Sequence, residues 1–245
     1  MKQIKFKIVQ FYYYFLAALS AIKGKIPSSI YKVRAKKLTY LSTKSLFDLS
    51  RAVQELDRQK VDGEIIEAGC ALGGSSIIIS QSKSRDRAFK IYDVFDMIPN
   101  PTTNDGDDVH QRYDVIKDGD AVGINGDKYY GYTENLIKVV SDNLTQFGTA
   151  PETNNIELIK GLFENTLHPS QQIALAHIDC DWYDPVKLCL ERITPNLSVN
   201  GKLIMDDYYE WSGCRDATDD FFKDKKNKFS FESINNKLHI KKLKD

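Results

Sequence analysis

Residues 176–181 read AHIDCD and residues 203–207 read LIMDD, and these two stretches decide the fold. Each is an apolar run that stops on acidic side chains. Runs rich in Val, Ile and Leu that end on turn residues are typical of buried parallel strands. Because ligands of an open α/β sheet bind beyond the carboxyl ends of its strands, both runs should deliver their acids to one edge. The side chains expected at that edge are Asp179, Asp181, Asp206 and Asp207.

Carboxylates gathered this closely repel one another and raise each other's pKa values. A divalent cation removes that conflict, and a set of oxygen ligands suits Mg²⁺. The sequence therefore predicts a carboxylate metal site at the sheet edge. Helix capping is the alternative for either cluster, since Asp at a strand end often caps the next helix and Asp-rich turns are common.

The first strand predicted along the chain is residues 63–69, GEIIEAG, which enters a glycine turn before a helix at 75–82 and a strand at 88–95. Strand, glycine turn, helix and strand in this order open a nucleotide-binding fold. The last two predicted strands alternate around Asn235-Asn236, a hairpin turn signal. We expect an α/β, Rossmann-like fold with a seven-stranded, mostly parallel sheet and a C-terminal antiparallel hairpin. The remaining strands are predicted at 156–160, 172–179, 202–206, 228–234 and 237–243.

Apolar residues at helical spacing predict a helix at 45–58 with Ser45 as its N-cap. Residues 99–131 break the alternation of helices and strands, being rich in Asp, Gly and Asn after Pro99 and Pro101. A loop this long inside a compact domain is usually functional or disordered. We expect an active-site lid with short helical pieces. Other helices are predicted at 133–147, 183–194 and 214–223.

The first 47 residues contain ten Lys and Arg and no acid, so the rest of this electrically neutral chain carries an excess of ten acids. Within this basic segment, residues 8–22 form an apolar, tyrosine-rich run that is short for a membrane span and untypical of a signal peptide. We expect a helical arm at 1–40, followed by the main domain at 41–245. The arm is either a packing helix in a homo-oligomer or an interfacial helix on a membrane.

The acidic body argues against a nucleic-acid partner. The four cysteines contain no C-x-x-C pair, which disfavours a zinc cage and a disulfide framework. We therefore expect a reduced, cytoplasmic protein, at the inner face of the membrane if the arm is interfacial.

The first strand–helix turn reads EAGCALGGS at residues 67–75. Glycine lets the backbone approach a ligand closely, and the N-terminus of the following helix favours a carboxylate. The spacing is not G-x-G-x-x-G, so a dinucleotide is disfavoured. Asp93 ends the second strand, where an acid commonly binds ribose hydroxyls. A tight turn and a helix cap are the alternatives for these two features.

These motifs resemble those of the macrocin O-methyltransferase family, the sugar O-methyltransferases of macrolide and aminocoumarin pathways. The resemblance runs from about residue 40 to residue 223. Its most specific parts are HIDCDWY at 177–183 and DDY at 206–208, followed by GCR at 213–215. The chain departs from the family at Cys180, where glycine is usual, and at Asn200, which replaces the first residue of a glycine pair.

The resemblance implies a class I methyltransferase fold, S-adenosyl-L-methionine as methyl donor and Mg²⁺ as metal. The expected acceptor is a hydroxyl of a sugar or glycosylated small molecule, in natural-product or surface-glycan biosynthesis. Within the cofactor site, Asp93 would bind the ribose, Ser75 the methionine carboxylate, and Phe163 and Glu164 would lie near the adenine. The implied metal ligands are Asp179, Asp206 and Asp207. The implied cofactor-binding residues are Glu67, Gly69, Gly73, Ser75, Asp93, Phe163 and Glu164.

A metal-bound sugar hydroxyl has a lowered pKa, but it still needs a proton acceptor. Catechol-type relatives carry a lysine three residues beyond the first metal aspartate, where this chain has Trp182. Asp181 is the first candidate for the general base and His110 the second; a helix cap and a surface position are the respective alternatives. His177 is expected to be a hydrogen-bonded strand residue.

Other functions stay open at this point. A Rossmann oxidoreductase would use a nicotinamide, although the pyrophosphate fingerprint is missing. A non-enzymatic, membrane-associated interaction protein would act through the basic arm. Metal-dependent phosphate hydrolysis lacks a recognisable group of residues to activate water.

Overall fold

The computed structural model describes residues 27–244 of the chain. The helix predicted at 8–22 lies outside these residues. None of the described helices is long and apolar enough to cross a membrane.

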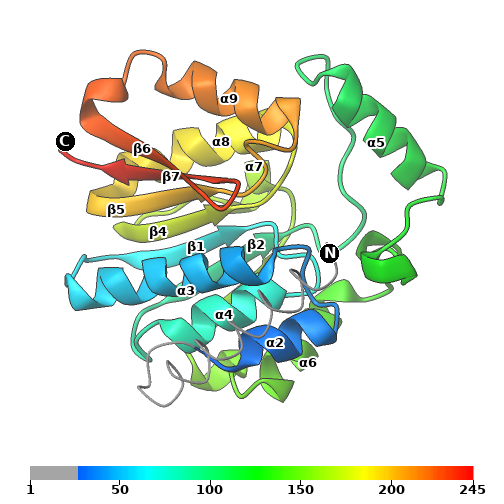
Figure 1. The fold of residues 1–245 in the computed structure, drawn as a ribbon, viewed down its shortest axis with the longest axis horizontal. Helices are drawn as coiled ribbons and strands as arrows, with labels where there is room; N and C mark the ends of the chain where they lie inside the picture. The colour runs from blue at the N-terminus through cyan, green and yellow to red at the C-terminus, as the bar shows by residue number, and fades with distance from the viewer. Residues whose placement is uncertain (1–26, 245) are drawn as a thin grey trace, which may run out of the picture.

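A single seven-stranded sheet forms the centre of the molecule, in the order β3-β2-β1-β4-β5-β7-β6 (Figure 1). The first five strands are parallel, and β7 pairs antiparallel with both β5 and β6. The predicted Rossmann-like fold with its C-terminal hairpin is confirmed. The strands are β1 (Glu64–Ala68), β2 (Phe89–Asp93), β3 (Ile156–Lys160), β4 (Ile173–Ile178), β5 (Leu197–Met205), β6 (Phe229–Ile234) and β7 (Lys237–Lys242).

Helices cover both faces of the sheet (Figure 1). One layer contains α2, α3, α4 and α6, and the other contains α7, α8 and α9. Each layer closes its own apolar core, so every residue of β1 and β4 is buried. The helices are α2 (Ser29–Ala35), α3 (Thr43–Arg58), α4 (Gly74–Ser82), α6 (Leu136–Gln146), α7 (Phe163–Thr166), α8 (Tyr183–Ile193) and α9 (Ser212–Phe222).

The segment predicted as a lid contains a regular helix, α5 (Asp107–Lys117), and two short 3-10 turns. Figure 1 shows α5 at the edge of the molecule, outside both helical layers. The helical pieces are as expected, and the closing movement of a lid stays a prediction.

Most predicted elements differ from the observed ones by a few residues at their ends, and two of these differences have a clear structural origin. The helix predicted at 45–58 begins at Thr43, because the Ser42 hydroxyl accepts a hydrogen bond from the Ser45 backbone N–H at 3.0 Å. Ser42 is therefore the N-cap, and the prediction of Ser45 was wrong. The strand predicted at 202–206 begins at Leu197. Its pairing register with β4 shifts between Leu197 and Lys202, and Asn200 in this stretch has a φ of 68°. This bulge hides the first half of β5 from a simple alternation pattern.

Candidate active site

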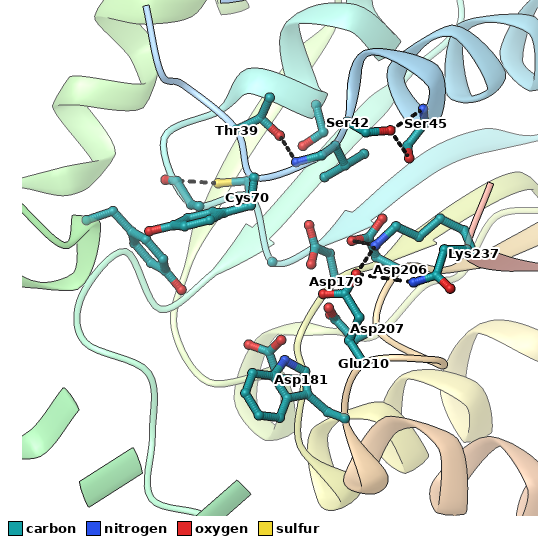
Figure 2. Close-up of a pocket in the computed structure, with 18 of the residues that line it drawn as sticks. Thr39, Ser42, Ser45, Cys70, Asp179, Asp181, Asp206, Asp207, Glu210 and Lys237 are labelled. Carbon is teal, nitrogen blue, oxygen red and sulfur yellow. Dashed lines mark hydrogen bonds and ion pairs between the residues drawn. The ribbon is translucent and has the colours of Figure 1, made fainter. Parts of the chain in front are cut away.

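A cavity of about 420 Å³ lies beyond the carboxyl ends of the parallel strands (Figure 2). A smaller cavity of about 170 Å³ adjoins it. Both are lined by the turn after β1, by the end of β2 and by the loop after β4. The site therefore consists of two compartments with a common wall. Residues that line both cavities are Gly69, Asp93, Tyr130, Asp179, Asp181 and Trp182.

The four predicted acids meet at this sheet edge, as Figure 2 shows. Carboxylate oxygens of Asp179, Asp181 and Asp207 lie within 4.8 Å of one another, and Asp179 and Asp206 form a similar group with His177. Asp179 and Asp181 follow β4, and Asp206 and Asp207 follow β5. The neighbouring pairing of these two strands brings the four side chains together.

Burial and mutual repulsion set the ionisation of this acid cluster. Burial, reinforced by Asp206, raises the pKa of Asp179 well above its usual range. Burial and the charge of Asp181 do the same for Asp207. For Asp181 the shift, again caused mainly by burial, takes the pKa to about 6. These groups are costly to ionise together without a compensating positive charge.

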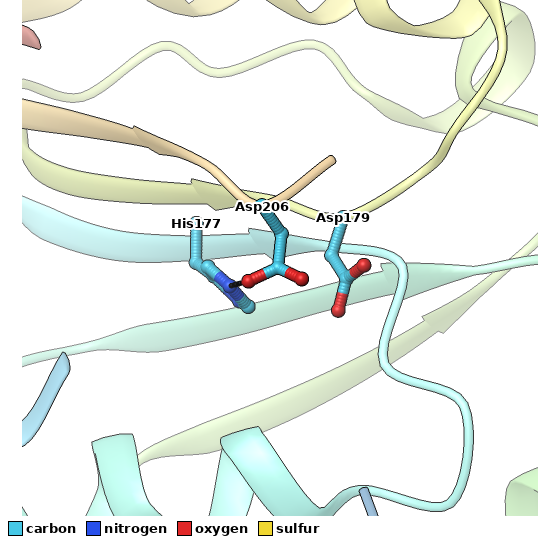
Figure 3. Close-up of side chains that lie close together, drawn as sticks. All are labelled: His177, Asp179 and Asp206. Atoms are coloured by element: carbon cyan, nitrogen blue, oxygen red, sulfur yellow. Dashed lines mark hydrogen bonds and ion pairs between the residues drawn. The ribbon is translucent and has the colours of Figure 1, made fainter. Parts of the chain in front are cut away.

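Asp206 differs from its neighbours because both its carboxylate oxygens have cationic or hydrogen-bonding partners. Its Oδ1 lies 3.4 Å from Nε2 of His177, and its Oδ2 lies 2.6 Å from Nζ of Lys237 (Figures 2 and 3). Burial opposes ionisation, but the His177 hydrogen bond and the nearby charges outweigh it and lower the pKa of Asp206. Asp206 is the acid most easily ionised in the cluster.

Glu67 does not line either cavity, although the resemblance implied a cofactor contact. Its Oε2 accepts a hydrogen bond from the Ser76 hydroxyl, and its Oε1 lies 2.9 Å from Nδ1 of His177. Despite burial, the carboxylates of Asp206 and Glu67 raise the pKa of His177 to about 10. His177 is thus the hydrogen-bonded strand residue that the sequence predicted, and Glu67 is its partner.

The glycine turn after β1 is shaped by close backbone packing. Gly69 has φ of 88°, and a Cβ on it would lie 1.9 Å from the backbone oxygen of Asp179. Only glycine fits there without displacement. Gly73 adopts φ of 81° as the N-cap of α4 and does not line either cavity. Ser75, in the first turn of α4, lines the larger cavity.

Asp93 lies at the end of β2 with its carboxylate held from two sides. Its Oδ2 accepts the Cys70 backbone N–H at 2.8 Å, and its Oδ1 accepts that of Phe95 at 2.7 Å. Burial nevertheless raises its pKa. Phe163 and Glu164, at the start of α7, line the smaller cavity with Asp93. The structure thus brings these three predicted cofactor residues to one compartment.

The lid segment contributes Arg112, Ile116, Tyr129 and Tyr130 to the larger cavity. His110 lies on α5 but lines neither cavity, and its Nε2 is 3.0 Å from the carbonyl oxygen of Thr102. The structure therefore does not bring the second candidate base to the acid cluster.

Lys237 is a site residue that the sequence analysis missed. It begins β7, and its side chain is 9% exposed. A lysine after an Asn-Asn hairpin turn gives no signal of its own. Lys237 comes next to Asp206 only because the strand order places β7 beside β5.

The sequence matches the macrocin O-methyltransferase (TylF) family over residues 35–239. Demethyldecarbamoylnovobiocin O-methyltransferase of Streptomyces niveus is 27% identical over 195 residues, which cover 75% of this chain and 67% of that protein. Mycinamicin III 3''-O-methyltransferase of Micromonospora griseorubida is 25% identical over 189 residues, with coverage of 75% and 69%. The O-methyltransferase NovP shares the fold, with a TM-score of 0.70 and 21% identity over 84% of this chain and 83% of that one. The chain therefore belongs to the macrocin O-methyltransferase family and is an O-methyltransferase.

Proposed function

We propose that this enzyme methylates a hydroxyl of a sugar or glycosylated small molecule, using S-adenosylmethionine and Mg²⁺. The observation that carries the proposal is the acid cluster of the larger cavity, of which Asp179 and Asp181 also lie on the wall shared with the smaller cavity. Such a wall suits a transfer reaction, in which donor and acceptor must meet at one point.

The residues present fit a divalent cation. The donors are carboxylate oxygens, which Mg²⁺ prefers. Oδ2 of Asp207 is buried and has no hydrogen-bond partner, an arrangement that is costly unless a ligand compensates it. We assign Asp179, Asp206 and Asp207 as the ligands. Asp179 joins the two groups of close side chains, because it lies with Asp206 and His177 in one and with Asp207 and Asp181 in the other. When bound, the cation would lower the pKa of the acceptor hydroxyl and orient it.

We assign the cofactor to the smaller cavity and to the turn after β1 beside it. Asp93 keeps acceptor capacity for ribose hydroxyls, because each of its oxygens uses one lone pair on a backbone N–H. Phe163 and Glu164 would contact the adenine, and Gly69 and Ser75 would lie along the methionine part. Glu67 and Gly73 would support the site without contacting the cofactor. Glu67 would do so through its contact with His177, and Gly73 as the N-cap of α4.

Asp181 is the group best placed to accept the proton of the acceptor hydroxyl. It lies on the common wall, where an acceptor bound in the larger cavity and the cofactor in the smaller one would both be within its reach. Its backbone is in the left-handed region, with φ of 60°. Non-glycine residues in that conformation gather at functional sites.

A sugar acceptor is supported by the named reactions of relatives and by the cavity wall. Tyr129, Trp182 and Trp211 present aromatic surface there, while Thr39 and Ser42 are hydroxyl residues of the same wall. Amphipathic walls of this kind suit a ring with apolar faces and polar edges. Contact of the arm with a membrane and assembly into a homo-oligomer depend on residues 1–40 and remain predictions.

Calorimetric titration of S-adenosylmethionine into the purified enzyme tests this function without knowledge of the acceptor. We expect saturable binding that Asp93→Ala removes and Asp86→Ala keeps, since Asp86 is an exposed acid that lines neither cavity. Binding of NAD in place of S-adenosylmethionine would overturn the proposal.

A further inference from the structure

The two adjacent aspartates after β5 are in opposite situations. Asp207 has a buried oxygen without a partner, whereas both oxygens of Asp206 have one. The closest of these partners is the Lys237 ammonium, 2.6 Å from Oδ2 of Asp206. A positive charge thus already lies against one of the proposed metal ligands.

Lys237 has a second carboxylate within reach. Its Nζ lies 3.4 Å from Oε1 of Glu210, whose side chain is 50% exposed. Both Lys237 and Glu210 line the larger cavity together with the acid cluster (Figure 2). The ammonium can therefore move from one carboxylate to the other without losing all of its compensation.

Electrostatics makes the ammonium and a divalent cation competitors for Asp206. Two positive charges that share one carboxylate repel each other, and repulsion is strong at partly buried sites. Without a cation, the ammonium offsets the repulsion among the acids. With a cation present, the same ammonium opposes its binding unless it shifts towards Glu210.

We propose that Lys237 is a positioning residue that holds Asp206 in the cation-free enzyme and competes with the divalent cation for that carboxylate. Glu210 is the second partner, which takes up the ammonium when the cation binds. This inference rests on the proposed metal site, and it explains why only Asp206 is already compensated.

The test is calorimetric titration of Mg²⁺, with Mn²⁺ as a second probe, at one fixed pH. Lys237→Met is expected to bind the cation about tenfold more tightly, because the competing charge is gone. Glu210→Gln is expected to bind it about threefold more weakly, because the ammonium loses its second partner. General damage to the fold would weaken cation binding in both variants, so changes of opposite sign in cation affinity exclude it.

Two control variants complete the set. Lys237→Arg keeps the charge and should stay close to the wild type in affinity. Lys242→Met removes an equally buried ammonium from the other end of β7, where Nζ donates to the carbonyl of Leu197 at 2.9 Å. It should leave cation affinity unchanged, whatever it costs in stability.

Thermal unfolding supplies a second readout. Lys237→Met should lower the midpoint in the absence of cation and gain more from added Mg²⁺ than the wild type does. A merely structural lysine would lower the midpoint equally in both conditions.

The failures of the two proposals are distinguishable. If the wild type binds neither cation, the metal site and this inference both fall. If the wild type binds Mg²⁺ but Lys237→Met binds it equally or more weakly, only this inference is overturned. Unchanged affinity in Glu210→Gln would remove Glu210 from the scheme.

Discussion

Gly69 packs directly against the backbone of Asp179, a member of the acid cluster. Gly69→Ala would force the two loops apart and strain a positive φ. We expect it to lower the free energy of unfolding by about 2–5 kcal/mol and to weaken cofactor binding. Urea denaturation and titration of S-adenosylmethionine measure the two effects.

Gly119 provides the matched control for that substitution. Its φ of 85° is nearly the same, but a Cβ on it would meet nothing within 4 Å. Gly119→Ala should therefore cost only about 1–2 kcal/mol, for the backbone strain alone. Equal losses in the two variants would show that close packing is not what requires glycine at position 69.

His177 is a buried residue between two carboxylates, those of Glu67 and Asp206. His177→Leu would leave both acids without this partner. Removing one member of a buried ionic group typically costs about 3–5 kcal/mol, and we expect a loss of that size in urea denaturation at neutral pH. His168→Leu, at an exposed position, should change stability little. A loss below about 1 kcal/mol for His177→Leu would mean that the two acids are compensated by other groups.

At the scale of elements, the lid segment is fastened at its beginning. Asp105 accepts the Tyr183 backbone N–H at 2.7 Å and that of Thr102 at 2.9 Å, so it joins the segment to the start of α8. Asp105→Ala should free residues 99–131 and speed tryptic cleavage there by about tenfold, since partly buried N–H groups lose a charged acceptor. Asp86→Ala, at an exposed position outside the segment, should leave the cleavage rate of residues 99–131 unchanged. Equal rates in both variants would contradict the role of Asp105.

The sequence predicted all seven strands because each is an apolar or alternating run between turn residues. It did not predict α7, which is too short for a repeating pattern to appear, and it predicted α2 only as part of a helical arm at 1–40. Nor did it predict that α5 would be a full helix, because the Asp-rich start of that segment resembles a loop. That start is favourable in a helix, since Asp107 and Asp108 lie in its first turn, at the positive end of the helix dipole.

The acid cluster could be predicted because strand ends share one edge of a sheet whichever order the strands take. Its counter-charges could not. Lys237 lies 31 residues from Asp206, and Glu67 lies 110 residues from His177. Only the strand order makes these pairs neighbours, and the order is a property of the whole sheet.

At the scale of the molecule, stability should depend on pH through His239 in β7. Burial, together with the charge of Lys202, lowers the pKa of His239 to about 4. The unfolded chain protonates this residue near pH 6.5, so between the two values it binds more protons than the folded protein does. The contribution is therefore fully present above about pH 6.5 and is lost as the pH falls towards 4.

His239→Gln should remove this part of the pH dependence. The wild type is expected to lose up to about 3 kcal/mol more than the variant between pH 6.5 and pH 4. Urea denaturation at several pH values measures the difference. Parallel curves for the two proteins would show that His239 titrates equally in the folded and unfolded states.

The polar chain that runs through Glu67, His177, Asp206 and Lys237 crosses β1, β4, β5 and β7. During synthesis the chain emerges from its N-terminal end, so β7 becomes available for pairing only after β1, β4 and β5. We expect the acids after β4 and β5 to come together before β7 docks beside them. A nearly folded chain would then contain a group of carboxylates without the nearby Lys237 ammonium. Docking of β7 reduces the repulsion among these carboxylates, because it brings the Lys237 ammonium to Asp206. The acid cluster thus favours, through its charge, the pairing of β7 with β5.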